Sequence, residues 1–199
     1  MLVNASFEKL DGWNLYHLGE QVAVNVEDRA TGALATLDET ALRFYSEWHV
    51  FQSGVYQSVR VTSGTPLKLS AWSFFFASSR SASLSDNQVR ELYTRFRVGI
   101  DPTGGFEPRS DKITWNAVGG DMLWKQAEVS TMAQAEEITV FVEAQVGKDW
   151  PMQIMAAHFD KCVLVVGDEQ NPVETSGEAA YYLDVPAFRI AVRRGVPVG

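Results

Sequence analysis

Arg-Phe-Arg-Val-Gly-Ile-Asp-Pro-Thr-Gly-Gly (residues 95–105) has the pattern of a β-strand that ends in a tight turn. Successive side chains of a strand point to opposite faces, so we expect an apolar face and a polar face here. The two sets are Thr94, Phe96, Val98 and Ile100 on one side and Arg95, Arg97 and Gly99 on the other. Asp101-Pro102 favours a turn, and Gly104-Gly105 tolerates positive φ. Two arginines opposite an apolar row favour a polar ligand surface built on a β-sheet.

Alternating patterns of the same kind recur along the chain. The expected strands are 55–61, 67–76, 93–100, 124–130, 138–146 and 158–166. Turn residues separate them, and no long stretch has a helical period, so the sequence predicts an all-β fold, an antiparallel β-sandwich. Residues 78–92 are rich in Ser, Asp and Asn and are the one candidate for a helix or an irregular excursion; of these readings and a long polar loop between strands, we favour the loop.

The composition changes after Gly167, which divides the chain into a sandwich domain (1–167) and a C-terminal segment (168–199). Residues 168–178 have linker character, and 181–194 are again strand-like, with Pro186 confining them to a sheet edge or a bulge. This tail could add an edge strand to its own sheet or reach another subunit. We favour the second, as a contact for a homo-oligomer, because the sandwich is complete by Val166.

Charge and composition exclude several classes of protein. A formal net charge of −8 argues against nucleic-acid partners and against anionic membrane surfaces. No apolar stretch has the length of a membrane span, and no signal peptide is visible. The single cysteine, Cys162, lies in an apolar run and fits a buried thiol.

Catalytic motifs are missing from the sequence, and we expect no enzyme. There is no Gly-x-Ser-x-Gly elbow, His-Glu-x-x-His pair or phosphate-binding glycine loop, and the three histidines lie far apart in the sequence. Acidic residues are numerous, so a carboxylate pair for glycoside cleavage stays open, although no spacing favours one.

Several short motifs resemble, in their order, those of carbohydrate-binding modules with the galactose-binding-like jelly roll. They are Leu-Val-Asn-Ala-Ser-Phe-Glu (2–8) with Gly12-Trp13, Gly-Val-Tyr-Gln-Ser-Val-Arg-Val (54–61), Gly-Thr-Pro-Leu-Lys-Leu-Ser-Ala-Trp (64–72), Thr-Val-Phe-Val (139–142) and His-Phe-Asp-Lys-Cys-Val-Leu (158–164). The closest likeness is to uncharacterised bacterial domains that carry the motif of residues 95–105 and a Trp a few residues later, here Trp115. The resemblance covers residues 2–166 and implies a jelly-roll sandwich; the segment after Gly167 has no counterpart.

The resemblance also implies a structural calcium ion, held by Glu8 of the first motif and by Asp160 of the last strand. Two carboxylates with backbone carbonyls suit a hard cation and would join the first and last strands. Lys161 departs from the family pattern, which has a second acidic residue there. The alternative is that Glu8 and Asp160 cap turns or pair with arginines.

A glycan-binding face is the second candidate site. Strand parity allows one face to carry aromatic, guanidinium and amide groups: Tyr56, Trp72, Phe74, Arg95, Arg97, Glu143 and Gln145. Alternatively, Trp72 and Phe74 belong to the core, and Arg95 only pairs with Glu143 across strands. Three tryptophans in predicted loops extend the candidate set, because loops at the end of a sandwich often bind ligands: Trp48, Trp115 and Trp150.

Two hypotheses for function follow. The first is a non-catalytic module that binds a cell-surface or extracellular polysaccharide through one sheet face and its loops, and is itself extracellular or surface-associated. The second is a structural protein, a component of a virion or appendage, that assembles through residues 168–199.

Overall fold

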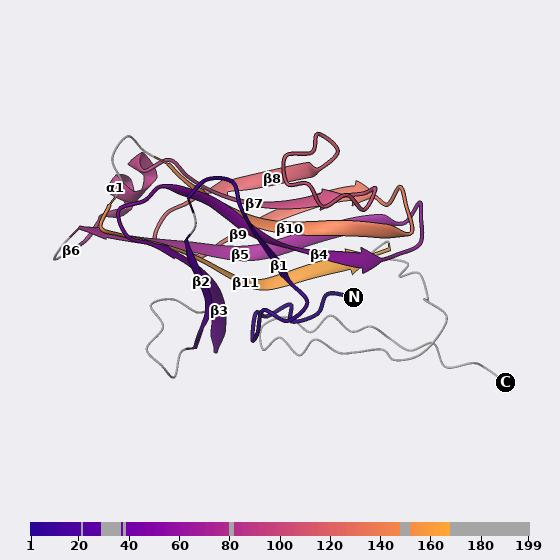
Figure 1. Ribbon diagram of the computed structural model, residues 1–199, viewed down its shortest axis with the longest axis horizontal. Helices are drawn as coiled ribbons and strands as arrows, with labels where there is room; N and C mark the ends of the chain where they lie inside the picture. The colour runs from indigo at the N-terminus through magenta and orange to yellow at the C-terminus, as the bar shows by residue number, and fades with distance from the viewer. Residues whose placement is uncertain (21, 29–36, 38, 80–81, 148–151, 168–199) are drawn as a thin grey trace.

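The computed structural model describes residues 1–20, 22–28, 37, 39–79, 82–147 and 152–167, and within them two antiparallel sheets form a β-sandwich (Figure 1). The first sheet has the strand order β1 (Asn14–His17), β4 (Phe51–Arg60), β10 (Glu137–Val146), β7 (Thr94–Asp101) and β8 (Thr114–Gly119). The second sheet has the order β2 (Ala23–Asp28), β3 (Thr40–Ser46), β11 (Ile154–Val166), β5 (Pro66–Ser79) and β6 (Ala82–Ser83), and β9 (Lys125–Met132) also pairs with β5. The predicted all-β sandwich is therefore confirmed.

The core lies between the sheets and is built from one face of each strand. In β7 the apolar set Phe96, Val98 and Ile100 is buried, as its alternation predicts. Phe96 reaches across to the second sheet, where its ring centroid lies 6.2 Å from that of Phe75 and 5.5 Å from that of Phe159. Aromatic rings at these separations bury a large apolar area, so this cluster joins the two sheets.

The six predicted strands all exist, but the segment 78–92 is not a simple loop. Strand β5 continues to Ser79, β6 follows, and a short helix, α1 (Asp86–Glu91), ends the excursion. Ser85 and Gln88 form a capping box, in which the Ser85 side chain accepts the Gln88 N–H and the Gln88 side chain accepts the Ser85 N–H. Val89 is buried on the sandwich. The expectation of a polar loop was wrong because this local Ser-x-x-Gln signal outweighs the polar composition.

Strands β1, β2 and β8, which lie at sheet edges, were not predicted. The prediction also missed β3, a seven-residue strand that lies between β2 and β11. Among the described residues no helix is long and apolar enough to cross a membrane. The predicted C-terminal segment, 168–199, lies outside the described residues.

Candidate functional site

The outer face of the first sheet gathers most of the predicted ligand-binding residues. The register of β1, β4, β10, β7 and β8 places side chains in rows that run across the strands. One row contains Tyr16, Gly54, Glu143, Arg97 and Ala117; the next contains Asn14, Tyr56, Phe141, Gly99 and Trp115. A third row contains Gln52, Gln145, Arg95 and Gly119. Because these residues alternate with the core residues of the same strands, they point away from the core.

Two glycines in these rows make room for aromatic rings. A Cβ atom at Gly99 would lie 2.5 Å from Cε3 of Trp115, and one at Gly54 would lie 2.4 Å from the hydroxyl oxygen of Tyr16. Both separations are far shorter than a van der Waals contact, so each ring lies directly over a glycine. Glycine in a strand interior often marks such a close approach.

The rings form a continuous group, which we call the aromatic face: Tyr16, Tyr56, Phe106, Trp115 and Phe141. Phe141 is buried beneath the others, with its centroid 5.8 Å from Tyr56 and 5.6 Å from Trp115. Phe106, from the loop between β7 and β8, stacks on Tyr56 at 6.4 Å with an interplanar angle of 16°, and 67% of it is exposed. The aromatic face thus has a buried floor and an exposed ring at its rim.

Glu143 is a fully buried carboxylate within this face. Its Oε1 accepts hydrogen bonds from Nε of Arg97 (2.5 Å) and Nε2 of Gln52 (3.1 Å), and its Oε2 accepts one from the Tyr16 hydroxyl (3.0 Å). Burial and the neighbouring Glu143 charge raise the pKa of the Tyr16 hydroxyl well above its usual value, so the phenol stays protonated and donates. Buried charges are tolerated when they are paired in this way.

Both arginines of β7 lie over aromatic rings. The Arg97 guanidinium carbon is 4.0 Å from the centroid of Trp115, and that of Arg95 is 5.0 Å from the centroid of Tyr93. Arg97 is half-buried, whereas Arg95 is exposed. These cation–π contacts hold two guanidinium groups on the same face, one row apart.

The structure brings together six of the predicted ligand-binding residues: Tyr56, Arg95, Arg97, Trp115, Glu143 and Gln145. The prediction of a single shared face is wrong for Trp72 and Phe74, because β5 belongs to the second sheet. They are not core residues either: both are half-buried on the outer face of that sheet, where Phe74 packs against Trp124 at 5.6 Å. The predicted cross-strand pair of Glu143 exists, but with Arg97 in place of Arg95.

Of the other two tryptophans predicted as ligands, the structure describes Trp48, which does not join this group. Trp48 lies in the loop between β3 and β4, with 52% of its surface exposed and a positive φ of 61°. Trp150 lies outside the described residues. Trp115, expected in a loop, is instead part of β8.

Sequence reasoning missed four residues of the site. Phe141 has the same strand parity as Glu143, so the alternation of β10 could have identified it. Tyr16 and Gln52 carry no such signal, since β1 is a four-residue edge strand and Gln52 lies at the start of β4. Phe106 lies in a loop, where periodicity gives no information.

The two predicted calcium ligands have different environments. Glu8 is exposed, whereas Asp160 is fully buried and accepts backbone N–H bonds from Lys161 (2.7 Å) and Leu37 (3.1 Å). It lies at the bulge of β11, where the N–H of Cys162 donates to the Ala5 carbonyl and ties the N-terminal segment to the last strand. Among the described residues no three His, Cys, Asp or Glu side chains form a group that could hold a metal ion. Calcium binding therefore stays a prediction.

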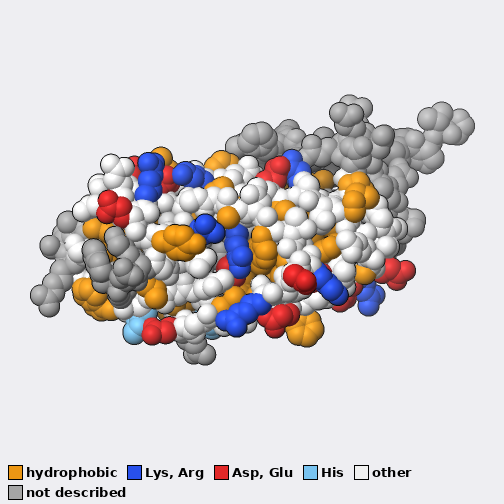
Figure 2. Space-filling view, turned by 90° about the horizontal axis from the view of Figure 1, so that it is seen from above, with side chains coloured by type: hydrophobic (Ala, Val, Ile, Leu, Met, Phe, Trp, Pro, Cys, Tyr) orange, Lys and Arg blue, Asp and Glu red, His pale blue; other side chains and the backbone are white. Residues whose placement is uncertain are grey.

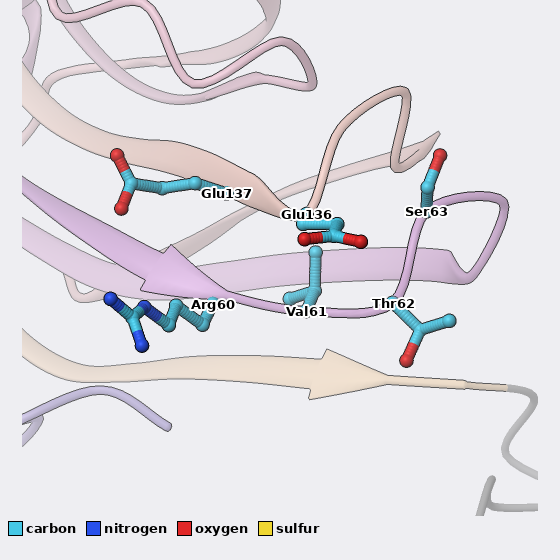
Figure 3. Close-up of a pocket in the computed structure, with 6 residues that line it drawn as sticks. All are labelled: Arg60, Val61, Thr62, Ser63, Glu136 and Glu137. Atoms are coloured by element: carbon cyan, nitrogen blue, oxygen red, sulfur yellow. The ribbon is translucent and has the colours of Figure 1, made fainter.

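A hollow of about 610 Å³ opens at the end of the first sheet where β4 ends and β10 begins (Figure 3). Its lining residues are Arg60, Val61, Thr62, Ser63, Glu136 and Glu137. No aromatic ring lines it, so it offers no stacking surface, and it lies at the opposite end of β4 from Gln52.

Seen from the side on which β8 lies, the described residues form no block of one charge. Figure 2 shows Lys and Arg side chains interspersed with hydrophobic and acidic ones. An extended basic surface for nucleic acid would need a field of one sign, and this side lacks it.

Comparisons with known proteins identify the fold. No protein-family model matches the chain, and no curated protein matches it. Among solved structures it is similar to TmCBM61 in complex with beta-1,4-galactotriose, at 16% identity and a TM-score of 0.57, over 82% of this chain and 95% of that one. It is also similar to part of the α-L-arabinofuranosidase MgGH51, at 15% identity and a TM-score of 0.54, over 83% of this chain and 26% of that one. A third similar structure is the enzymatically active domain of bacteriophage CBA120 tailspike protein 4, at 10% identity and a TM-score of 0.53, over 83% of this chain and 21% of that one. The chain shares its β-sandwich fold with carbohydrate-binding modules, as its motifs predicted.

Proposed function

We propose that this chain is a non-catalytic carbohydrate-binding module that binds a polysaccharide through the outer face of the first sheet. The observation that carries the proposal is the aromatic face with its arginines and amides. Sugars offer apolar C–H patches and hydroxyl groups, and this face presents ring surfaces beside Arg97, Gln52 and Gln145. Similarity in fold to TmCBM61, determined with galactotriose, supports the same class of ligand.

The arrangement suits weak, rigid binding. The side chains project from paired strands, and Glu143 fixes three of them by hydrogen bonds: Tyr16, Gln52 and Arg97. A pre-organised surface loses little conformational entropy when a ligand binds. Repetition of the binding unit along a polymer would multiply a weak affinity of the single site. Such a ligand would place the protein outside the cell or at its surface.

Affinity electrophoresis of the purified protein in gels that contain soluble polysaccharides tests the proposal, and isothermal titration follows with any polymer that retards the protein. We expect Phe106→Ala to weaken binding by about tenfold, as truncation of an aromatic anchor in a binding surface commonly does. Its melting temperature should change little, because the ring is mostly exposed. Met132→Ala removes an exposed apolar side chain from β9 of the second sheet and is the matched control.

Retention that is unchanged in Phe106→Ala and in Trp115→Ala would show that the polymer binds elsewhere. If a folded protein is retarded by no polysaccharide in a panel of plant, bacterial and algal polymers, the binding function is wrong. Calcium belongs to the same test: runs with calcium and with EDTA would show whether an ion held by Glu8 and Asp160 supports the fold or the binding.

The second candidate is a structural role in a virion or appendage, with residues 168–199 as the contact between subunits. The observation that favours it is the similarity in fold to part of a bacteriophage tailspike protein. Light scattering on the full chain and on residues 1–167 separates the two roles. If the deletion converts an oligomer to monomers, the result supports assembly. If both proteins contain the same number of chains per particle, that support is removed.

A further inference from the structure

The two arginines of β7 are the least explained part of the face. Arg97 uses its Nε for Glu143, and within the part of the chain that the structure describes its two terminal nitrogens have no hydrogen-bond partner. Arg95 has no ion pair among the described residues and is exposed. A sheet that bound only neutral sugars through stacking would need neither free guanidinium fork.

Aromatic rings hold both guanidinium groups in place. Each lies over a ring, Arg97 over Trp115 and Arg95 over Tyr93, so fewer rotamers are lost when a ligand binds. Residues i and i+2 of one strand lie about 6.6 Å apart on the same face. The planar fork of arginine matches a carboxylate through two parallel hydrogen bonds. Glu143 bonds only to Nε of Arg97, so the edge formed by the two terminal nitrogens of the guanidinium group stays open to a ligand.

We propose that the ligand is an acidic polysaccharide whose carboxylates pair with Arg95 and with the free edge of Arg97. This inference rests on the proposed function and names the class of its substrate. Arg95 is the residue that sets the specificity, because it adds an unpaired positive charge beside the stacking surface. Arg97 contributes donors but, through Glu143, also holds the face together.

The charge of the whole chain does not oppose such a ligand at short range. The net charge is −8, but charges in 0.15 M salt are screened over about 8 Å. In the rows of described residues that contain the two arginines, the carboxylate is Glu143, which is already paired. The attraction is therefore local, and added salt should weaken it.

The test compares each acidic polymer with its own neutral form. Polygalacturonate, alginate and hyaluronan are run in affinity gels beside the same polymers after methyl esterification of their carboxylates, together with a neutral galactan. We expect the wild-type chain to bind at least one acidic polymer about tenfold more tightly than its ester, since hydrogen bonds to charged groups are the stronger ones. Arg95→Gln should remove most of that preference, so that the variant binds the acidic polymer and its ester with similar affinity.

Lys68→Gln is the matched control, because it removes one positive charge from the outer face of the second sheet. It should leave the preference intact. Equal binding to acid and ester forms, or a preference that survives Arg95→Gln, would overturn the inference. Retention by the neutral galactan alone would also overturn it while leaving polysaccharide binding in place. Failure to bind any polymer would overturn both.

Discussion

Removing the Arg97 side chain is the sharpest test of how the face is built, because it leaves a buried charge without its cation. Glu143 is fully buried, and Arg97 is the only cation bonded to it among the described residues. Breaking a buried pair from one side costs about 3–5 kcal/mol. Tyr16 and Gln52 still donate hydrogen bonds to Glu143 in Arg97→Met, so we expect the free energy of unfolding to fall by the low end of this range, about 3 kcal/mol. Methionine keeps an apolar stem over Trp115, which limits the loss of packing.

Urea unfolding followed by tryptophan fluorescence measures the loss, and thermal unfolding checks it. For a domain of this size, 3 kcal/mol corresponds to a fall in melting temperature of about 6–12 °C. Adding Glu143→Gln to Arg97→Met should restore part of the stability, because the double variant buries no charge. The four proteins of this cycle give the coupling energy of the pair, which we expect to exceed about 1 kcal/mol.

Arg90→Met supplies the control for the same kind of change. Its partner Asp121 is also fully buried, but Asp121 keeps a second cation, Lys125, at 2.6 Å. We therefore expect Arg90→Met to cost no more than about 1 kcal/mol, as for a surface ion pair. If Arg97→Met costs no more than Arg90→Met, or if the cycle is additive, the reasoning about Glu143 is refuted.

Three further predictions concern the same molecule. Gly99→Ala should displace the Trp115 indole ring that lies over this position, cost about 1–3 kcal/mol of stability and abolish polysaccharide retention. Gly119→Ala is the control, because its Cβ would lie in open space, and it should change neither stability nor retention. Equal retention of the two variants in affinity gels would contradict this. Calcium should raise the melting temperature if Glu8 and Asp160 hold it, and Glu8→Gln should remove that rise; a melting temperature that is identical in calcium and in EDTA would end the calcium hypothesis. The folded-state pKa of Tyr16 lies above its unfolded value, so its contribution to stability is full below about pH 10 and is lost as the pH rises through the folded pKa. In Tyr16→Phe, the free energy of unfolding measured in urea should fall less steeply with pH in this alkaline range. The same dependence on pH in the variant and the wild type would contradict the assignment.

The fold was readable from the sequence because its central strands alternate strictly. Strand β7 shows why: Phe96, Val98 and Ile100 are all buried, and the residues between them form the opposite face. The edge strand β1 could not be predicted, because four residues are too few to show an alternating pattern and because its position depends on pairing with β4. Local patterns describe a strand, and they do not say which sheet the strand joins.

That gap explains the errors at the site. Trp72 has the parity of an outward residue in its own strand, and so has Arg97, yet the strands that carry them lie in opposite sheets. The alternation along a strand says whether a side chain points toward the core or away from it. Two side chains share a face only if their strands also belong to the same sheet. The partner of Glu143 depended on register: Glu143 lies directly opposite Arg97, and Arg95 lies opposite Gln145. A shift of two residues would have given the predicted pair.

The glycines give the strongest argument that the face is built to bind. Glycine in a strand interior lowers stability, because it costs backbone entropy and packs no side chain. This sheet has two such positions, Gly54 and Gly99, and at each of them an aromatic ring takes the space of the missing side chain. A surface that needed only solubility would favour β-branched or charged residues there. The two glycines instead let the rings of Trp115 and Tyr16 lie close to the sheet, where Arg97 contacts the first and Glu143 accepts a hydrogen bond from the second. The sheet loses some intrinsic strand stability and in return presents a fixed array of rings and hydrogen-bond donors.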